Sequence, residues 1–424
     1  MTTRIAGTSS SVRTAALAIF AIFATNGFIF ASWAARIPAV TQTLGLSTGE
    51  MGGVLLVGAI GSLIALPLTG TVVDRIGLKA AVRLGGAFAV TAGAIIALGL
   101  LAHSVWVVAA GMVVFGAGVA LWDVAQNIGG ADVEHRLGRT IMPQFHAAFS
   151  GGAVLGALVG AGLSAAGVDL PLHLFGIIVV VLAIMVVVPR YFLAHDAAHS
   201  PDAEPSPDAA WSQSAGSPQD AVPATAAEPK AGALEAWRHP RTVLIGVVVL
   251  GATLTEGAGN DWISKGVVDG LGSSEAAGAG LFAVFVGAMT LARWFGGRVI
   301  DRVGRVVALR ISMVSAAIGL TAYSLAGTYW LSAVGAVFWG LGAALAFPMG
   351  MSAAADDPRK AAARVSVVST IGYIAFLAGP PFLGFLGDHL GLRHALLVIL
   401  VPILVALALA GVTRKEAAPA RAGD

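Results

Sequence analysis

Long apolar segments recur from one end of the chain to the other. A window of about 20 mostly apolar residues, the length that crosses a hydrocarbon core, finds twelve of them. Soluble domains have about a quarter of their residues charged, whereas this chain has 11% charged and 57% hydrophobic residues. The pattern predicts an all-α integral membrane protein. Its twelve transmembrane helices are expected at 14–36, 51–73, 82–102, 105–127, 143–166, 171–189, 242–264, 276–297, 307–327, 329–351, 364–386 and 393–412.

The basic residues are divided unequally between the two sides of the membrane. An even number of spans puts both termini on one side. The loops and termini of that side hold all 25 Lys and Arg residues except Arg36, Lys265 and Arg393. The positive-inside rule places the basic side in the cytoplasm. We therefore expect a multi-pass protein of the inner (plasma) membrane with both termini cytoplasmic.

The segment between the sixth and seventh spans differs from the rest of the chain. Residues 191–240 are rich in Ala, Pro, Ser and Asp and have few large apolar side chains. Such a composition predicts a disordered linker, here on the cytoplasmic side. It separates an N-terminal six-helix bundle, residues 1–190, from a C-terminal six-helix bundle, residues 241–424.

The two halves repeat one short motif at the end of their second span. It reads GTVVDRIG in the first half and GRVIDRVG in the second. Both copies fit G-x-x-x-D-R-x-G at the same spacing. The residues are Gly70, Asp74, Arg75 and Gly77, and Gly297, Asp301, Arg302 and Gly304.

The repeated motif, the twelve spans and the long central segment together resemble the major facilitator superfamily over the whole chain. The resemblance implies two pseudo-symmetric six-helix bundles with a midplane substrate cavity, working by alternating access. It also implies a gating role for the motif. Asp74 and Asp301 can pair with Arg or cap a neighbouring helix, and Gly70 and Gly297 permit close helix approach. The alternative is that the motif charges only mark the membrane boundary.

Two acids lie deep inside predicted spans, Asp123 and Glu256. A charge at the bilayer centre costs roughly 2.5–3.5 kcal/mol on insertion scales, so such residues are functional candidates. At 1.5 Å per residue, Glu256 lies about 3 Å from the centre of its span. The arginines near cytoplasmic span ends are expected to snorkel: Arg83, Arg293, Arg310 and Arg364.

We predict that these two acids couple transport to protons. A carboxyl in a low-dielectric site favours its neutral form and can load and release a proton. The first, fourth, seventh and tenth spans line the cavity in the superfamily, and Asn26, Asp123 and Glu256 fall on three of them. The sequence WDVAQN, which contains Asp123, resembles the fourth span of fucose-type proton symporters. The alternative is a structural acid satisfied by a neighbouring helix.

Seven further polar or aromatic residues are candidates for substrate binding. Asn260 is one turn from Glu256 and shares its face. His146 either relays protons or is an interfacial residue, and Phe347 and Tyr373 either stack on a ligand or only pack. The full set is Asn26, Asn127, His146, Asn260, Asp261, Phe347 and Tyr373.

The stretches WDVAQN, MPQFHAAFS, FASWAARIP and GPPFLG resemble a bacterial, rhizopine-transporter-like and fucose-permease-like branch of the superfamily. This resemblance implies symport of a small polar, sugar- or polyol-like solute. The expected partners are that solute, protons and the lipid bilayer. A net charge of +2 gives no reason to expect a nucleic-acid partner. We expect the protein to be a monomer.

Other functions remain open. A proton-driven exporter of drugs or metabolites is one, although the fifth span lacks the exporter-type G-P motif. A non-transporting sensor or scaffold is another. We expect no enzyme, since no paired nucleophile and base is found, and no cofactor or metal. The chain has no cysteine, which excludes thiolate metal sites. No P-loop lysine accompanies the Gly-rich stretches.

Overall fold

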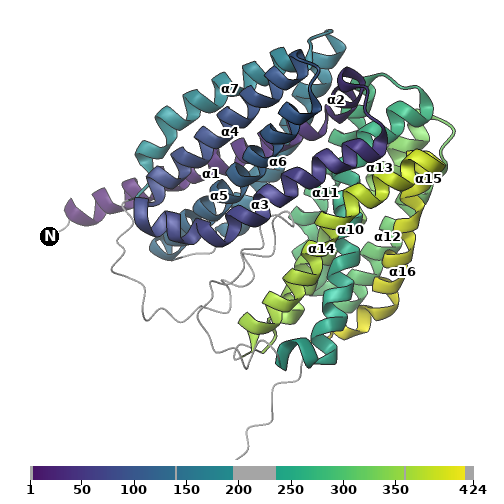
Figure 1. Ribbon diagram of the computed structural model, residues 1–424. Coiled ribbons are helices and arrows are strands. Elements are labelled where there is room, and N and C mark those ends of the chain that lie inside the picture. The colour runs from purple at the N-terminus through teal and green to yellow at the C-terminus, as the bar shows by residue number, and fades with distance from the viewer. Residues whose placement is uncertain (1–2, 139–140, 194–234, 358–359, 416–424) are drawn as a thin grey trace, which may run out of the picture.

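The structure is a computed structural model that describes residues 3–138, 141–193, 235–357 and 360–415. The described residues form an all-helical protein, and twelve of its helices are long and apolar enough to cross a membrane (Figure 1). The predicted fold class is therefore confirmed. The linker expected at 191–240 falls mostly on 194–234, outside the described residues.

The N-terminal half contributes six spanning helices and one short helix, α2, between the first two. The elements are α1 (Thr3–Ala34), α2 (Ile37–Leu44), α3 (Thr48–Ile76), α4 (Leu78–Leu101), α5 (Val105–Leu137), α6 (Met142–Ala165), α7 (Leu170–Val187) and the 3-10 turn η1 (Val188–Tyr191).

The C-terminal half contributes five long helices and a sixth span made of short pieces. The long helices are α10 (Pro240–Leu271), α11 (Glu275–Val303), α12 (Arg305–Leu325), α13 (Tyr329–Ala354) and α14 (Ala361–Leu390). The last span consists of α15 (Leu392–Ala395), η4 (Leu396–Ile399), α16 (Leu400–Leu409) and η5 (Ala410–Thr413).

Two local features differ from the sequence prediction. The fourth span was expected at 105–127, but α5 continues to Leu137 and ends where Gly138 takes a left-handed φ of 63°. Its last turns are polar, and a hydrophobic window cannot detect helix that has left the apolar layer. The short helix α2 was not predicted. Pro38 stands in its first turn and Gly45 ends it with a φ of 64°.

The two halves pack their helices in the same pattern. In the first half α1 packs on α6 and α5 packs on α3 and α4. In the second half α10 packs on α14 and α13 packs on α11 and α12. The interface between the bundles follows the same rule, because α3 contacts α14 while α6 contacts α11. The bundles are thus related by a pseudo-two-fold exchange.

Small residues allow close helix contact inside each bundle. A Cβ on Gly27 of α1 would overlap the carbonyl of Phe149 in α6, and a Cβ on Gly152 of α6 would overlap the carbonyl of Ala24 in α1. Membrane helices associate through such van der Waals contact rather than by hydrophobic exclusion. The outward faces carry exposed apolar side chains such as Leu17 (69% exposed) and Trp330 (78% exposed), which suits contact with lipid.

The two bundles meet on one side of the molecule and diverge toward the other. We call the first the α2 side and the second the linker side, where η1 ends and α10 begins. Figure 1 shows the bundles approaching each other near α2 and α15 and splaying apart at the opposite end.

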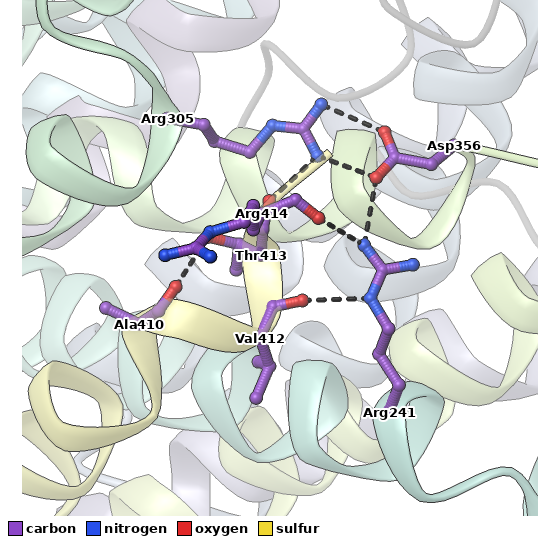
Figure 2. Close-up of polar contacts among 7 residues, drawn as sticks. All are labelled: Arg241, Arg305, Asp356, Ala410, Val412, Thr413 and Arg414. Atoms are coloured by element: carbon purple, nitrogen blue, oxygen red, sulfur yellow. Dashed lines mark hydrogen bonds and ion pairs between the residues drawn. The ribbon is translucent and has the colours of Figure 1, made fainter. Parts of the chain in front are cut away.

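A charged cluster ties together the linker side of the C-terminal bundle (Figure 2). Asp356, just after α13, accepts hydrogen bonds from Arg241 at the start of α10 (3.0 Å) and from Arg305 at the start of α12 (3.0 and 3.2 Å). The same two arginines donate to backbone carbonyls of the last span, at Val412, Thr413 and Arg414. The cluster therefore joins four helix ends within one bundle.

Candidate functional site

On the α2 side, a carboxylate of one bundle caps a helix of the other bundle. Asp388, near the end of α14, accepts hydrogen bonds from the Ser47 hydroxyl (3.0 Å) and from the backbone N–H groups of Thr48 (2.8 Å) and Gly49 (3.0 Å). These groups form the first turn of α3, where unpaired N–H groups and the helix dipole favour a negative charge. We call this contact the Asp388 cap.

Further polar contacts join the bundles on the same side. Arg36 lies 3.5 Å from the Glu275 carboxylate at the start of α11. Lys265 donates to the Thr41 hydroxyl of α2 at 3.3 Å and forms an ion pair with Asp269 at 2.7 Å. These contacts and the Asp388 cap come from loops and helix ends, so they can break without disturbing the interior of either bundle.

A cavity lies between the bundles beneath these contacts. It is lined by α1, α2, α3 and α5 from one bundle and by α10 and α14 from the other. Most of its wall is apolar, and five aromatic side chains contribute to it: Phe30, Trp33, Phe115, Tyr373 and Phe376. The polar side chains of the lining are Asp261 and Ser62, whose hydroxyl donates to the Gly116 carbonyl at 2.9 Å, and Trp33 and Tyr373 add an N–H and an O–H to their rings.

Tyr373 forms the boundary of this cavity toward the linker side. It comes from α14 and packs against a small apolar cluster of the opposite bundle, made of Leu66, Ala120 and Val124. Its ring lies 6.5 Å from that of Phe376. The contact crosses between bundles, so a change in their tilt would open or close it.

Of the seven residues predicted to bind substrate, Asp261 and Tyr373 line the cavity. The side chain of Asp261 is partly exposed. It lies on α10 five residues after Glu256, which rotates it by about 140° around a helix of 3.6 residues per turn. The two acids therefore face different surroundings, Asp261 toward the opposite bundle and Glu256 into its own.

Glu256 is buried in an ion pair within the C-terminal bundle. Its Oε1 accepts a hydrogen bond from Nη2 of Arg293 in α11 at 2.8 Å, and Glu256 is 1% exposed. Arg293 also donates to the Ala344 carbonyl of α13 at 3.4 Å. The sequence interpretation that Arg293 snorkels at a helix end is wrong. It lies ten residues before the end of α11 and satisfies the acid of α10.

Asp123 is buried among amides of its own helix. Its Oδ1 accepts from Nε2 of Gln126 at 2.9 Å and from Nδ2 of Asn127 at 3.3 Å. Asn127 also donates to the Asp123 carbonyl at 2.9 Å. Asp123 follows the cavity-lining residues Val119 and Ala120 by one helical turn on α5. It therefore lies just beyond the cavity on the linker side.

The remaining candidates are buried outside the cavity lining. Asn26 is 2% exposed and precedes the lining residues Phe30 and Trp33 by one and two turns on α1. His146 packs edge-on against the Phe23 ring at 5.1 Å. The other two are Asn260, 6% exposed, and Phe347, 3% exposed.

The gating-motif residues lie on the linker side, at the α3–α4 and α11–α12 junctions. Gly77 and Gly304 have φ values of 79° and 81°, a backbone region that favours glycine. The charged side chains of the motif are exposed: Asp74, Arg75, Asp301 and Arg302. Gly70 is partly buried. A Cβ on Gly297 would meet nothing within 4 Å, so the close helix approach expected there is not made in this conformation.

Sequence reasoning missed two residues, Arg293 and Asp388. Arg293 carried no sequence signal that distinguishes it from a snorkelling arginine. Asp388 did carry one, because GFLGDHLG at residues 384–391 repeats the spacing G-x-x-x-D-x-x-G. Gly391 also repeats the positive φ of the motif glycine, at 76°.

Comparisons with known proteins agree with this architecture. The family model described as Major Facilitator Superfamily matches residues 3–142 and 263–424. An uncharacterised MFS-type transporter of Yersinia pestis is 29% identical over 394 residues, covering 92% of this chain and 93% of its own. The uncharacterised transporter y4wD of Sinorhizobium fredii is 30% identical over 392 residues, covering 90% and 96%.

Among solved structures, the nucleoside transporter NupG aligns with a TM-score of 0.70 at 14% identity. The alignment covers 94% of this chain and 99% of NupG. At this identity the likeness concerns the fold, and the substrate in its title is a property of NupG.

Proposed function

Because the chain belongs to the Major Facilitator Superfamily, we propose that it is a proton-coupled symporter that moves a small polar solute by alternating access. The coarser part, a secondary transporter in a membrane that acts on a small molecule, follows from the family and from relatives named as transporters. Coupling to protons, symport and a sugar- or polyol-like solute are the proposal. Transport is a sufficient function for the observed fold and site, and the proposal includes no enzymatic reaction.

The observation that carries proton coupling is the buried Glu256–Arg293 pair. Burying two charges costs several kcal/mol per ion, and their mutual attraction offsets part of that cost only while the pair stays together. Protonation of Glu256 would remove its charge and release Arg293 to a new partner. The pair joins α10 to α11, two helices that contact the opposite bundle or line the cavity. A proton on Glu256 can therefore change how the bundles pack.

Asp123 is the second proposed protonation site. It is 1% exposed and bonded to neutral amides. It lies one helical turn beyond the cavity lining toward the linker side, and we propose that it exchanges its proton with that side.

The charge distribution supports an orientation with the linker side in the cytoplasm. The three basic residues of the opposite side are all buried, Arg36 at 3%, Lys265 at 5% and Arg393 at 7% exposure. Arg393 donates to the carbonyls of Tyr323 and Ala326. The other Lys and Arg residues of the described ranges lie on the linker side, and the positive-inside rule assigns the side richer in them to the cytoplasm. The conformation then has its outer side closed. The narrower rhizopine-transporter-like and fucose-permease-like assignment remains part of the proposal.

The proposal is tested in proteoliposomes loaded with a pH-sensitive dye and challenged with hexoses, inositols and amines. A symported solute carries protons inward and acidifies the lumen, and an imposed proton gradient drives its accumulation. Glu256→Gln and Asp123→Asn are expected to abolish uphill accumulation, whereas Asp132→Asn, a substitution in an exposed ion pair with Arg136, leaves it intact. Full uphill transport by both acid variants would refute proton coupling through these residues.

A proton-driven exporter is the second candidate, because the cavity wall is largely apolar and aromatic. An exporter of this kind would lower the accumulation of hydrophobic dyes in intact cells. Symport instead predicts no difference in dye retention between cells with and without the protein.

A further inference from the structure

We propose that the cavity between the bundles selects a protonated amine, with Asp261 as its counter-ion. The inference rests on the proposed transport function, but it replaces the sugar- or polyol-like solute of that proposal with an amine. A neutral sugar or polyol then becomes the competing outcome.

The charge of the cavity comes from one side chain. Among the described residues that line it, Asp261 contributes a carboxylate and no Lys, Arg or His is present. A wall of this kind attracts a cation and repels an anion. The cavity wall is also largely apolar, and apolar groups screen charge less than water does, which strengthens the attraction.

Asp261 differs from Glu256 and Asp356 in having no cation within ion-pair distance among the described residues. Glu256 is paired with Arg293 at 2.8 Å. Asp356 is paired with Arg241 and Arg305, each at 3.0 Å. Charges inside a membrane protein are usually paired, and one that faces a cavity marks a ligand or ion pathway. The position opposite Asp261 is therefore the place for a cation that the solute brings.

The aromatic lining adds a second attraction for the same class of solute. Phe30, Trp33 and Phe115 come from one bundle, and Tyr373 and Phe376 from the other. Ring faces attract an ammonium group, most strongly when it is removed from water, and they bury the hydrocarbon part of an amine.

A neutral polyol has many hydroxyls and finds few polar groups in this wall, those of Asp261, Ser62, Trp33 and Tyr373. Buried hydroxyls cost free energy unless they find hydrogen-bond partners. The hydroxyl of Ser62 already donates to Gly116, so it offers only its acceptor lone pairs. The buried amides of Asn26, Asn127 and Asn260 lie outside the lining of the cavity in this conformation.

The test uses two probes of similar shape that differ in charge, 2-phenylethylamine and 2-phenylethanol, with myo-inositol as the polyol. Each is titrated into the purified full-length protein at pH 7, and the thermal midpoint is followed, since a ligand of the native state raises it. We expect the amine to raise the midpoint saturably and the alcohol and inositol to leave it unchanged.

Variants separate recognition by Asp261 from general binding. Asp261→Asn is expected to weaken amine binding by about tenfold or more, Asp261→Glu to retain part of it, and Asp132→Asn to bind like the original chain. If Asp261→Asn does not fold, Asp261→Glu and the amine–alcohol comparison decide.

Equal binding of the amine and the alcohol, a response to inositol alone, or undiminished amine binding by Asp261→Asn would overturn the inference. Loss of proton-driven transport without loss of amine affinity in Asp261→Asn would also overturn it and assign Asp261 to coupling. The binding outcomes do not bear on the proteoliposome test of the original chain, which is scored by luminal pH, so failure of this inference can be told apart from failure of the transport proposal.

Discussion

Three acids within the membrane-spanning helices have three different environments. Asp123 is bonded to amides of its own helix, Glu256 to an arginine of a neighbouring helix, and Asp261 faces the cavity between the bundles. The sequence predicted that all three are candidates, because charge inside an apolar span is costly. It did not predict their partners. Which face of α10 meets α11 depends on the rotation of each helix about its own axis. A hydropathy window averages over all faces of a helix, so it does not predict that rotation.

The buried ion pair leads to a prediction at this scale. Arg293→Ala leaves the Glu256 carboxylate buried without its guanidinium, a change that costs about 3–5 kcal/mol when a buried pair is broken from one side. We expect a clear drop in the thermal midpoint of the purified protein. The double variant Glu256→Gln with Arg293→Met removes both charges and should recover much of the loss. A double variant no more stable than Arg293→Ala would contradict a direct pairing.

At the scale of the helix, the spacing G-x-x-x-D-x-x-G occurs at three helix ends. Gly77, Gly304 and Gly391 follow α3, α11 and α14 with φ between 76° and 81°. The helix-capping contact that the sequence predicted for Asp74 and Asp301 is made instead by Asp388, on the opposite side of the molecule. The two linker-side copies are exposed in this conformation, so their gating role stays a prediction for the alternate state.

The Asp388 cap should stabilise the closure of the α2 side. Helix caps are worth about 1 kcal/mol, so Asp388→Ala is expected to shift the equilibrium between conformations by about fivefold. Because the chain has no cysteine, Ser62→Cys in the cavity wall gives a unique reporter. Its labelling by an impermeant thiol reagent from the α2 side should become faster.

His389→Ala is the matched control for this experiment. The His389 ring is exposed and bonds to the Phe385 carbonyl of its own helix at 2.9 Å. In the His389→Ala variant, the introduced cysteine should be labelled at the same rate as in the parent protein. Equal labelling rates in Asp388→Ala and His389→Ala would show that the cap does not hold the side closed.

The helices themselves were the most predictable part of the fold. Twelve spans follow from hydropathy because each must bury its backbone polar groups within one apolar helix. The helix α2, the polar end of α5 and the broken last span lay beyond this reasoning. They depend on Pro38, Gly138 and 3-10 turns at helix ends rather than on an apolar window.

At the scale of the whole molecule, the repeat found in the sequence is realised as two bundles with matching helix contacts. What the sequence could not predict is the conformation, because one chain must support at least two. The closed α2 side depends on contacts such as Arg36–Glu275 and Lys265–Thr41 between residues far apart in sequence.

The orientation of the molecule can be tested directly. If the linker side faces the cytoplasm, as its larger number of basic residues predicts, green fluorescent protein fused after the last residue will fluoresce in intact bacteria. Alkaline phosphatase fused at the same point will be inactive. A dark fluorescent fusion together with an active phosphatase fusion would reverse the orientation.

The central claim is that protonation shifts the balance between two arrangements of the bundles. It is tested most directly by measuring distances between spin labels on two pairs of introduced cysteines. Because the chain has no cysteine of its own, each pair can be introduced and labelled separately. Arg83 and Arg310 are exposed on the linker side, and Ala102 and Gly327 on the α2 side. We predict that lowering the pH changes the two distances in opposite senses, and that Glu256→Gln makes both insensitive to pH. Distances that stay fixed, or that change in the same sense, would contradict proton-coupled alternating access.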